Sequence, residues 1–261
     1  MNLGLTGKKA LVLGSSQGIG AEIARVLAQE GCNVYLGARR LDRIQSLADD
    51  LSEEFNVDTK AYPIDLSDGI SVEKLREMIA HEWKVDILLN NAGGPPPSTS
   101  TGVPDEIWES SLQSLLMSTI RLSEAAVEGM RERGWGRILT VASSGVIQPI
   151  PNLAVSNTVR SAVVGFTKTL SNEVAKDGIT VNMILPGRID TERLASLHKA
   201  SANKLGMTYE EFRNNARSSI PARRFGTAKE FAEVAVFLMS VCASYITGSV
   251  IRVDGGVIQS V

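Results

Sequence analysis

The chain has 261 residues, of which 43% are hydrophobic and 21% are charged, and its net charge is −2. This composition is typical of a globular protein with a large core and excludes an intrinsically disordered chain. Acidic and basic residues are interspersed, so we expect neither nucleic acid nor a membrane as a partner. The two cysteines lack metal-site spacing, and the first residues show no signal-peptide pattern. We therefore expect a cytoplasmic protein without a metal.

Strand-like and helix-like segments alternate along the chain. Seven segments rich in β-branched and apolar residues predict strands at Ala10–Leu13, Asn33–Leu36, Thr59–Pro63, Asp86–Asn90, Arg137–Ala142, Thr180–Leu185 and Ser249–Val253. Periodic apolar stripes between them predict helices at Ile19–Glu30, Asp42–Phe55, Val72–Glu82, Asp105–Arg133, Asn152–Lys176 and Lys229–Val241. This alternation predicts an α/β fold, a doubly wound parallel sheet of the Rossmann type in one domain over 1–261.

One crossover is longer than the others. Between the sixth and seventh predicted strands, residues 191–224 contain two polar, weakly amphipathic helical pieces. An insertion at this point lies over the carboxyl ends of the strands, where sheets of this type bind ligands. We therefore expect a lid-like segment that lines the substrate pocket.

Glycines follow the first predicted strand at Gly14, Gly18 and Gly20, with Ser16 and Ile19 between them. Glycine permits a sharp turn and a close approach of the backbone to a pyrophosphate, and the next helix offers free N–H groups and a positive dipole end. The spacing differs from the common dinucleotide fingerprint, whose first two glycines are one residue apart. The segment indicates a nucleotide phosphate site, and a tight turn without a ligand is the alternative reading.

Four further motifs occur in a characteristic order. They are Asn90-Asn91-Ala92-Gly93, Pro186-Gly187, Ile246-Thr247-Gly248 and Val253-Asp254-Gly255-Gly256. With the glycine loop, they resemble the short-chain dehydrogenase/reductase family over essentially the full length, most closely its 3-oxoacyl-acyl-carrier-protein reductase-like branch. The resemblance implies hydride transfer between a nicotinamide cofactor and a small-molecule carbonyl or alcohol. It also implies a homotetramer built around two paired long helices, with the last strand forming a second interface.

The resemblance assigns cofactor roles to matching positions. The glycine loop, with Ser16 and Ile19, holds the pyrophosphate. The other implied contacts are Asp65 to the adenine, Asn90 to the adenosine ribose, Pro186, Gly187 and Ile189 to the nicotinamide, and Thr191 near the phosphates.

The end of the second predicted strand bears on the choice between NADP and NAD. NAD-specific relatives place an acid at the position of Ala38, and this chain has Arg39 and Arg40 directly after it. With no acid to repel it, a 2′-phosphate can pair with Arg39. We therefore expect NADP, with NAD as the alternative.

The catalytic positions depart from the family pattern. Carbonyl reduction needs a proton for the developing alkoxide, and the family supplies it from a tyrosine four residues before a lysine. Here those positions are Ser156 and Arg160, the family serine falls on Ser143, and the helix asparagine falls on Leu115. A serine hydroxyl is a weaker acid than a phenol, whereas an arginine stays charged and offers a fork of donors.

Two functions remain open on the sequence. The first is an oxidoreductase with an atypical relay, in which Ser143 binds the substrate oxygen and Arg160 holds the cofactor ribose. Its proton would pass through Ser156, a water molecule, or a lid residue such as His198 or Tyr209. The second is a catalytically silent cofactor-binding sensor or partner subunit.

Overall fold

The computed structural model describes residues 1–260 and places seven strands in one parallel sheet in the order β3-β2-β1-β4-β5-β6-β7. The strands are β1 (Lys9–Leu13), β2 (Asn33–Ala38), β3 (Thr59–Pro63), β4 (Ile87–Asn90), β5 (Gly136–Val141), β6 (Ile179–Pro186) and β7 (Val250–Val253). The sheet is therefore the doubly wound Rossmann arrangement that the alternation predicted, and all seven strands occur where we expected them, to within a few residues.

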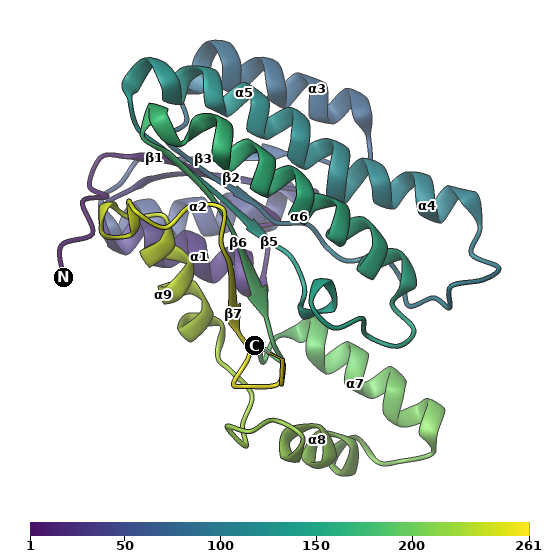
Figure 1. The fold of residues 1–261 in the computed structure, drawn as a ribbon. Helices are drawn as coiled ribbons and strands as arrows, with labels where there is room; N and C mark the ends of the chain where they lie inside the picture. The colour runs from purple at the N-terminus through teal and green to yellow at the C-terminus, as the bar shows by residue number, and fades with distance from the viewer. Residues whose placement is uncertain (261) are drawn as a thin grey trace.

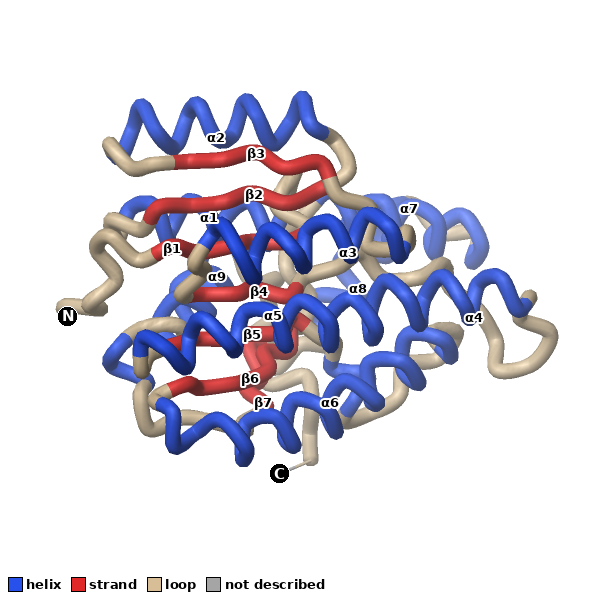
Figure 2. Tube along the Cα trace, turned by 90° about the horizontal axis from the view of Figure 1, so that it is seen from above, coloured by secondary structure: helices blue, strands red, loops and turns tan. Residues whose placement is uncertain are grey.

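Helices cover both faces of the sheet, as Figures 1 and 2 show. One layer consists of α1 (Gly18–Gln29), α2 (Leu41–Phe55) and α9 (Ala228–Leu238); the other consists of α3 (Gly69–Met78), α5 (Ser118–Arg133) and α6 (Ala154–Val174). Successive side chains of a strand point to opposite faces. Accordingly, Ala10 and Val12 of β1 join the core under α1 and α9, whereas Leu11 and Leu13 join the core under α3 and α5.

The long helix predicted over 105–133 contains a local change of pitch. The chain runs from α4 (Asp105–Ser111) through η2 (Leu112–Met117), a wider π-type turn, into α5. Such bulges are rare and are frequent at functional sites. A second π-type turn, η1 (Ile79–Trp83), ends α3, and short 3₁₀ turns follow β5, α6 and α9 as η3 (Ser144–Val146), η4 (Ala175–Asp177) and η5 (Val241–Ala243).

The predicted insertion forms two helices, α7 (Glu192–Leu205) and α8 (Tyr209–Ser218), which project from the sheet in Figure 1. The insertion begins and ends at one place, because Ile189 pairs with Gly226 in a short parallel bridge. The amide of Asp190 donates to the Gly226 carbonyl at 2.8 Å, and the amide of Gly226 donates to the Arg188 carbonyl at 3.1 Å. This closure makes residues 190–225 a compact excursion beside the carboxyl ends of the strands.

Within residues 1–260, no helix combines the length and the apolar composition that crossing a bilayer requires.

Candidate active site

The site begins where the strand order reverses, between β1 and β4. The glycine loop after β1 folds tightly: a Cβ added to Gly20 would lie 2.3 Å from the Gly14 carbonyl oxygen. Asn91, directly after β4, donates from Nδ2 to the carbonyls of Leu13 at 3.2 Å and Gly14 at 3.3 Å. The loop and the first turn of α1 are therefore held together by contacts that leave no room for a side chain.

The structure offers room and charge for a dinucleotide here. A Cβ added to Gly93 would meet no atom within 4 Å, so the surface beside the loop is open. Arg40 donates from Nη2 to the Ser16 hydroxyl at 3.2 Å and also bonds Gln17. Arg43 reaches the same Gln17 at 3.1 Å. The role of Arg43 was not predicted from the sequence, because its distance along the chain does not show that the start of α2 lies beside the glycine loop.

Asp65 lies after β3 at the same end of the site. Burial raises the pKa of its carboxyl, but two hydrogen bonds from Ser67 and the nearby charge of Arg39 outweigh burial and lower that pKa below its ordinary value. Asp65 is therefore an ionised acceptor beside Arg39. The arrangement brings Asp65, which the resemblance assigned to the adenine, close to Arg39, which we expect at a 2′-phosphate.

The side chain of Asn90, which the resemblance assigned to the adenosine ribose, lies against α5. Its side chain is buried and donates to Ser123 of α5 at 3.1 Å, and its Oδ1 has no partner within residues 1–260. Any contact of Asn90 with a cofactor ribose would therefore come from its backbone. The neighbouring Asn91 points toward the glycine loop, because successive residues at a strand end face opposite sides.

The nicotinamide-side residues follow β6. The Gly187 amide donates to the Val253 carbonyl at 2.9 Å, and a Cβ on Gly187 would lie 2.5 Å from Asp254 Cα. Pro186 and Gly187 thus pack directly on the end of β7. Ile189 is buried, and Thr191 caps α7 by accepting from the Leu194 amide at 3.3 Å. The Thr191 side chain also faces Gly18 of the glycine loop.

Ser143 follows β5 and caps the short turn η3. Its Oγ accepts the Gly145 amide at 3.1 Å, so its O–H is free to donate to a substrate oxygen. Asn157 of α6 fastens this loop, donating to the Ile150 carbonyl at 2.9 Å, and packs against Gly145. Asn157 was missed on the sequence; it joins the loop of Ser143 to the helix of Ser156.

Ser156 and Arg160 lie one turn apart on α6, and both are buried. Arg160 donates from Nη1 to the Val141 carbonyl at 3.0 Å and from Nη2 to the Ala92 carbonyl at 3.2 Å. Its guanidinium therefore bridges the carboxyl ends of β5 and β4. Burial and the charge of Arg193 lower the pKa of Arg160 to about 10, which still leaves it protonated at neutral pH.

A small cavity of about 10 Å³ lies beside Arg160 at the π-type turn η2, with room for about one water molecule. Its lining includes Asn90, Leu115 and Thr140. Leu115, which the resemblance aligns with the family asparagine, is buried against Val155 and Val159. Its side chain carries no polar group, and the polar groups around the cavity include Ser114 of the same turn and Arg160 of α6.

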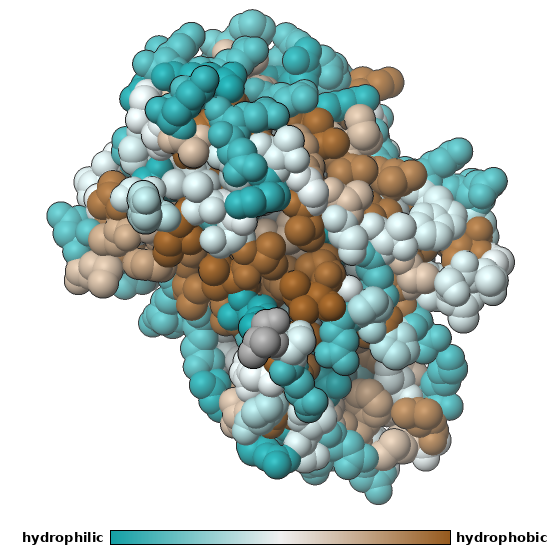
Figure 3. Space-filling model, in the orientation of Figure 1, coloured by the Kyte–Doolittle hydropathy of each residue, from teal (hydrophilic) through white to brown (hydrophobic). Residues whose placement is uncertain are grey.

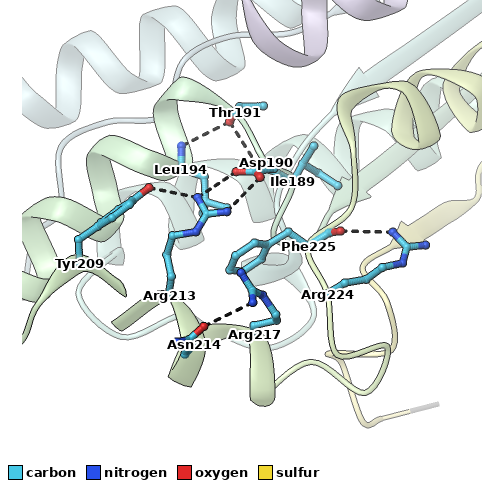
Figure 4. Close-up of polar contacts among 10 residues, drawn as sticks. All are labelled: Ile189, Asp190, Thr191, Leu194, Tyr209, Arg213, Asn214, Arg217, Arg224 and Phe225. Atoms are coloured by element: carbon cyan, nitrogen blue, oxygen red, sulfur yellow. Dashed lines mark hydrogen bonds and ion pairs between the residues drawn. The ribbon is translucent and has the colours of Figure 1, made fainter. Parts of the chain in front are cut away.

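The lid residues considered as proton donors are engaged elsewhere. His198 lies 5.2 Å from the Phe212 ring and 5.5 Å from the Phe225 ring, inside the core of the lid. The Tyr209 hydroxyl accepts from Arg213, whose fork also binds Asp190 at 3.0 and 3.2 Å (Figure 4). These contacts leave Ser143, Ser156 and Arg160 as the chemical groups that the fold gathers at the carboxyl edge.

The fold and this site define a class: a Rossmann-type, NAD(P)-dependent oxidoreductase with its cofactor loop at the switch between β1 and β4. The family model described as enoyl-(acyl carrier protein) reductase matches residues 14–258. The chain is 35% identical over 253 residues to the 3-oxoacyl-[acyl-carrier-protein] reductase FabG of Escherichia coli strain K12, covering 96% of this chain and 97% of that one. It belongs to the short-chain dehydrogenase/reductase family.

Solved structures agree with this membership. L-sorbose reductase from Gluconobacter frateurii, complexed with NADPH and L-sorbose, superposes with a TM-score of 0.94 at 35% identity, covering 100% of both chains. An actinorhodin polyketide ketoreductase variant with NADPH superposes with a TM-score of 0.89 at 31% identity, covering 96% of this chain and 97% of that one. The agreement over the full length means that the lid and the last strand also have counterparts in these relatives.

The environment of His198 makes lid stability depend on pH. Burial and the charges of Arg188 and Arg213 lower the pKa of His198 below its ordinary value of 6.5, against the opposing charge of Asp190. Below about pH 6.5 the unfolded chain binds a proton on His198 that the folded chain resists, so stability falls as pH falls through this range. When the pH is lowered from about 8 to about 5, we expect the melting temperature of His198→Phe to fall less than that of the natural chain.

The matched control is His81→Gln, because His81 is the other histidine and its side chain is 73% exposed. It should retain the pH dependence of the natural chain in differential scanning calorimetry. Equal losses in the natural chain and His198→Phe would contradict a buried, neutral His198.

Proposed function

We propose that this protein is an NADP-dependent reductase that converts a small-molecule ketone into an alcohol and also catalyses the reverse oxidation. In this reaction Ser143, Ser156 and Arg160 act on the substrate oxygen. The observation that carries the proposal is their position: the fold places a free hydroxyl donor and a buried guanidinium at the strand ends that face the glycine loop. The balanced reaction is ketone, NADPH and a proton giving alcohol and NADP⁺.

The residues present fit the cofactor, as the open surface at Gly93 and the cations around Ser16 indicate. Gly14, Gly18, Gly20 and Ile19 would hold the pyrophosphate, and Arg39, Arg40 and Arg43 the 2′-phosphate. Pro186, Gly187, Ile189 and Thr191 would hold the nicotinamide side. When bound, the nicotinamide supplies a hydride to the carbonyl carbon or takes one from the alcohol carbon.

The protein groups act on the oxygen of the substrate. Ser143 donates its O–H to that oxygen, because the hydroxyl accepts the Gly145 amide and its own hydrogen remains free. Arg160 stabilises the negative charge that develops on the oxygen and binds the ribose hydroxyls with its remaining N–H groups. Ser156 fills far less space than a tyrosine and leaves room for a water molecule, which we propose delivers the proton through the Ser156 hydroxyl.

We also propose a homotetramer in the cytoplasm. The edge strand β7 is only partly buried. Figure 3, which has the orientation of Figure 1, shows hydrophobic surface in the middle of the face where β7 lies. An exposed apolar edge strand needs a partner. The antiparallel pairing of α5 and α6 with the same helices of another copy would form the other interface. Light scattering on the purified protein tests this assembly, and a monomer would contradict it.

The hydride transfer is tested by following NADPH oxidation with 3-oxoacyl thioesters, ketoses and quinones. We expect turnover by the natural chain and a loss of about 10²-fold in kcat/KM for Ser143→Ala, the cost of removing one oxyanion donor. The control is Ser144→Ala, because the hydroxyl that caps the η3 turn belongs to Ser143 and not to its neighbour Ser144. Tight NADPH binding without turnover, together with activity gained by Ser156→Tyr plus Arg160→Lys, would support the sensor or partner subunit instead.

The cofactor preference is tested separately by fluorescence titration with NADPH and NADH. Each of Arg39→Ala and Arg40→Ala removes a charged partner of the 2′-phosphate, so we expect about a tenfold or greater weakening of NADPH binding. NADH binding should change little. Arg25→Ala, which breaks the surface pair with Glu54, is the control. Equal losses for both cofactors would place these arginines away from the 2′-phosphate.

A further inference from the structure

Two guanidinium groups from different elements meet above Gly94. A Cβ added to Gly94 would lie 3.0 Å from Arg193 Nη2 and 3.8 Å from Arg160 Nη2. Arg193, near the start of α7 in the lid, donates to the Gly94 carbonyl at 3.2 Å. Arg160, on α6, donates to the Ala92 carbonyl at 3.2 Å. The lid and the floor of the site therefore each direct a positive charge to the same short loop.

Neither group has an acidic partner in the part of the chain that the structure describes. The ion pairs of residues 1–260 take up other arginines, namely Arg25, Arg76, Arg131, Arg133, Arg213 and Arg224. Arg160 and Arg193 instead donate to uncharged carbonyls and repel each other. Arg193 is exposed and therefore accessible to a ligand, and an anion bound between the two guanidinium groups would offset their repulsion.

Arg137 shows how this chain satisfies a buried arginine that has only a structural role. It lies at the opposite end of the sheet, donates to the carbonyls of Gly136, Gly178 and Ser240, and stacks on Trp135 at 4.5 Å. Arg160 has two carbonyl acceptors for its five N–H groups and no aromatic ring. Its remaining N–H groups are therefore available to the cofactor ribose and to a substrate.

The loop under the two arginines lies on the substrate side of the site. At one end Asn91 binds the glycine loop. At the other end Ser98 pairs with Leu153, just before Ser156. The Ser98 amide donates to the Asn152 carbonyl, and the Ser98 carbonyl accepts from the Ala154 amide. Gly94 lies between these ends, followed by the stiff run Pro95-Pro96-Pro97. An anion above Gly94 is therefore placed between the cofactor loop and the groups that hold the reacting oxygen.

We propose that the substrate is an oxo acid, whose carboxylate is bound by Arg193 and Arg160 above Gly94 while its carbonyl faces Ser143. The inference rests on the proposed reductase function and names its substrate class. Guanidinium forks match the two oxygens of a carboxylate. The pyrophosphate of the cofactor is the other anion that reaches this part of the site, and the experiment separates the two.

The probes are acetoacetate and 2-oxobutanoate, each compared with its methyl ester, which keeps the ketone and removes the charge. Binding is measured by the change in fluorescence of NADPH already bound to the full-length protein, and turnover by NADPH oxidation. We expect the acids to bind at least about tenfold more tightly than the esters. Arg193→Met should abolish this preference and leave the Kd for NADPH within about twofold.

Lys204→Met is the control, because it removes one positive charge from the far end of the same helix. It should retain the preference for acids, and Arg193→Lys should retain part of it. Equal binding of acid and ester by the natural protein would overturn the inference. The inference would also be overturned if Arg193→Met bound NADPH tenfold more weakly and kept the same ratio of acid to ester binding. That result would assign Arg193 to the pyrophosphate.

Failure of the reductase function gives a different result. If no probe is reduced but the acids still bind more tightly than their esters, and Arg193→Met removes that difference, then the carboxylate site stands and the proposed hydride transfer is wrong. Arg160→Lys provides a second variant of the buried group; it should weaken acid binding more than ester binding, since it keeps the charge and loses the fork.

Discussion

The meeting of β1 and β4 at the switch in strand order is the constraint on which the site depends. Asn91 binds the carbonyls of Leu13 and Gly14, and Gly20 packs on Gly14 with no space for a methyl group. These contacts fix the glycine loop against the end of β4, and the same strand end continues into the loop that carries Ala92 and Gly94. One rigid junction therefore sets both the cofactor loop and the carbonyls that hold Arg160 and Arg193.

An arginine at position 160, where the resemblance places the family lysine, would change how that junction is held. A lysine offers one flexible ammonium group, whereas the Arg160 fork spans the ends of β4 and β5 with two hydrogen bonds. A guanidinium also keeps its proton at neutral pH despite burial, so it serves as a fixed positive charge. In the proposed reaction the proton would therefore come from a hydroxyl or a water molecule. A leucine at position 115 is consistent with that proposal, because its side chain has no group that could pass a proton.

Much of this architecture could be predicted from the sequence. The alternation of apolar segments gave all seven strands, and the four-residue spacing correctly placed Ser156 and Arg160 on one face of α6. Most of the roles that were missed share a physical cause: Asn91, Asn157 and Arg193 each donate to a backbone carbonyl, and any residue type supplies a carbonyl. Such bonds leave no pattern in the partner segment. The environment of Asn90 was also beyond sequence reasoning, since it depends on which side of the strand end its side chain faces.

The lid and the site are linked through the same short segment. The aromatic contacts of His198, Phe212 and Phe225 give residues 190–225 a small core, and the Ile189–Gly226 bridge joins that unit to the sheet at one place. The Asp190–Arg213 pair adds little to stability, because the carboxylate is half-exposed and such pairs contribute at most about 1 kcal/mol. The lid also meets the end of the chain, since the Ala222 amide donates to the Gly255 carbonyl at 3.1 Å, and it meets the loop after β4, since Arg193 donates to the Gly94 carbonyl at 3.2 Å. Arg193 lies on the lid and Arg160 on the sheet side, so an anion bound between the two guanidinium groups would join the lid to the floor of the site.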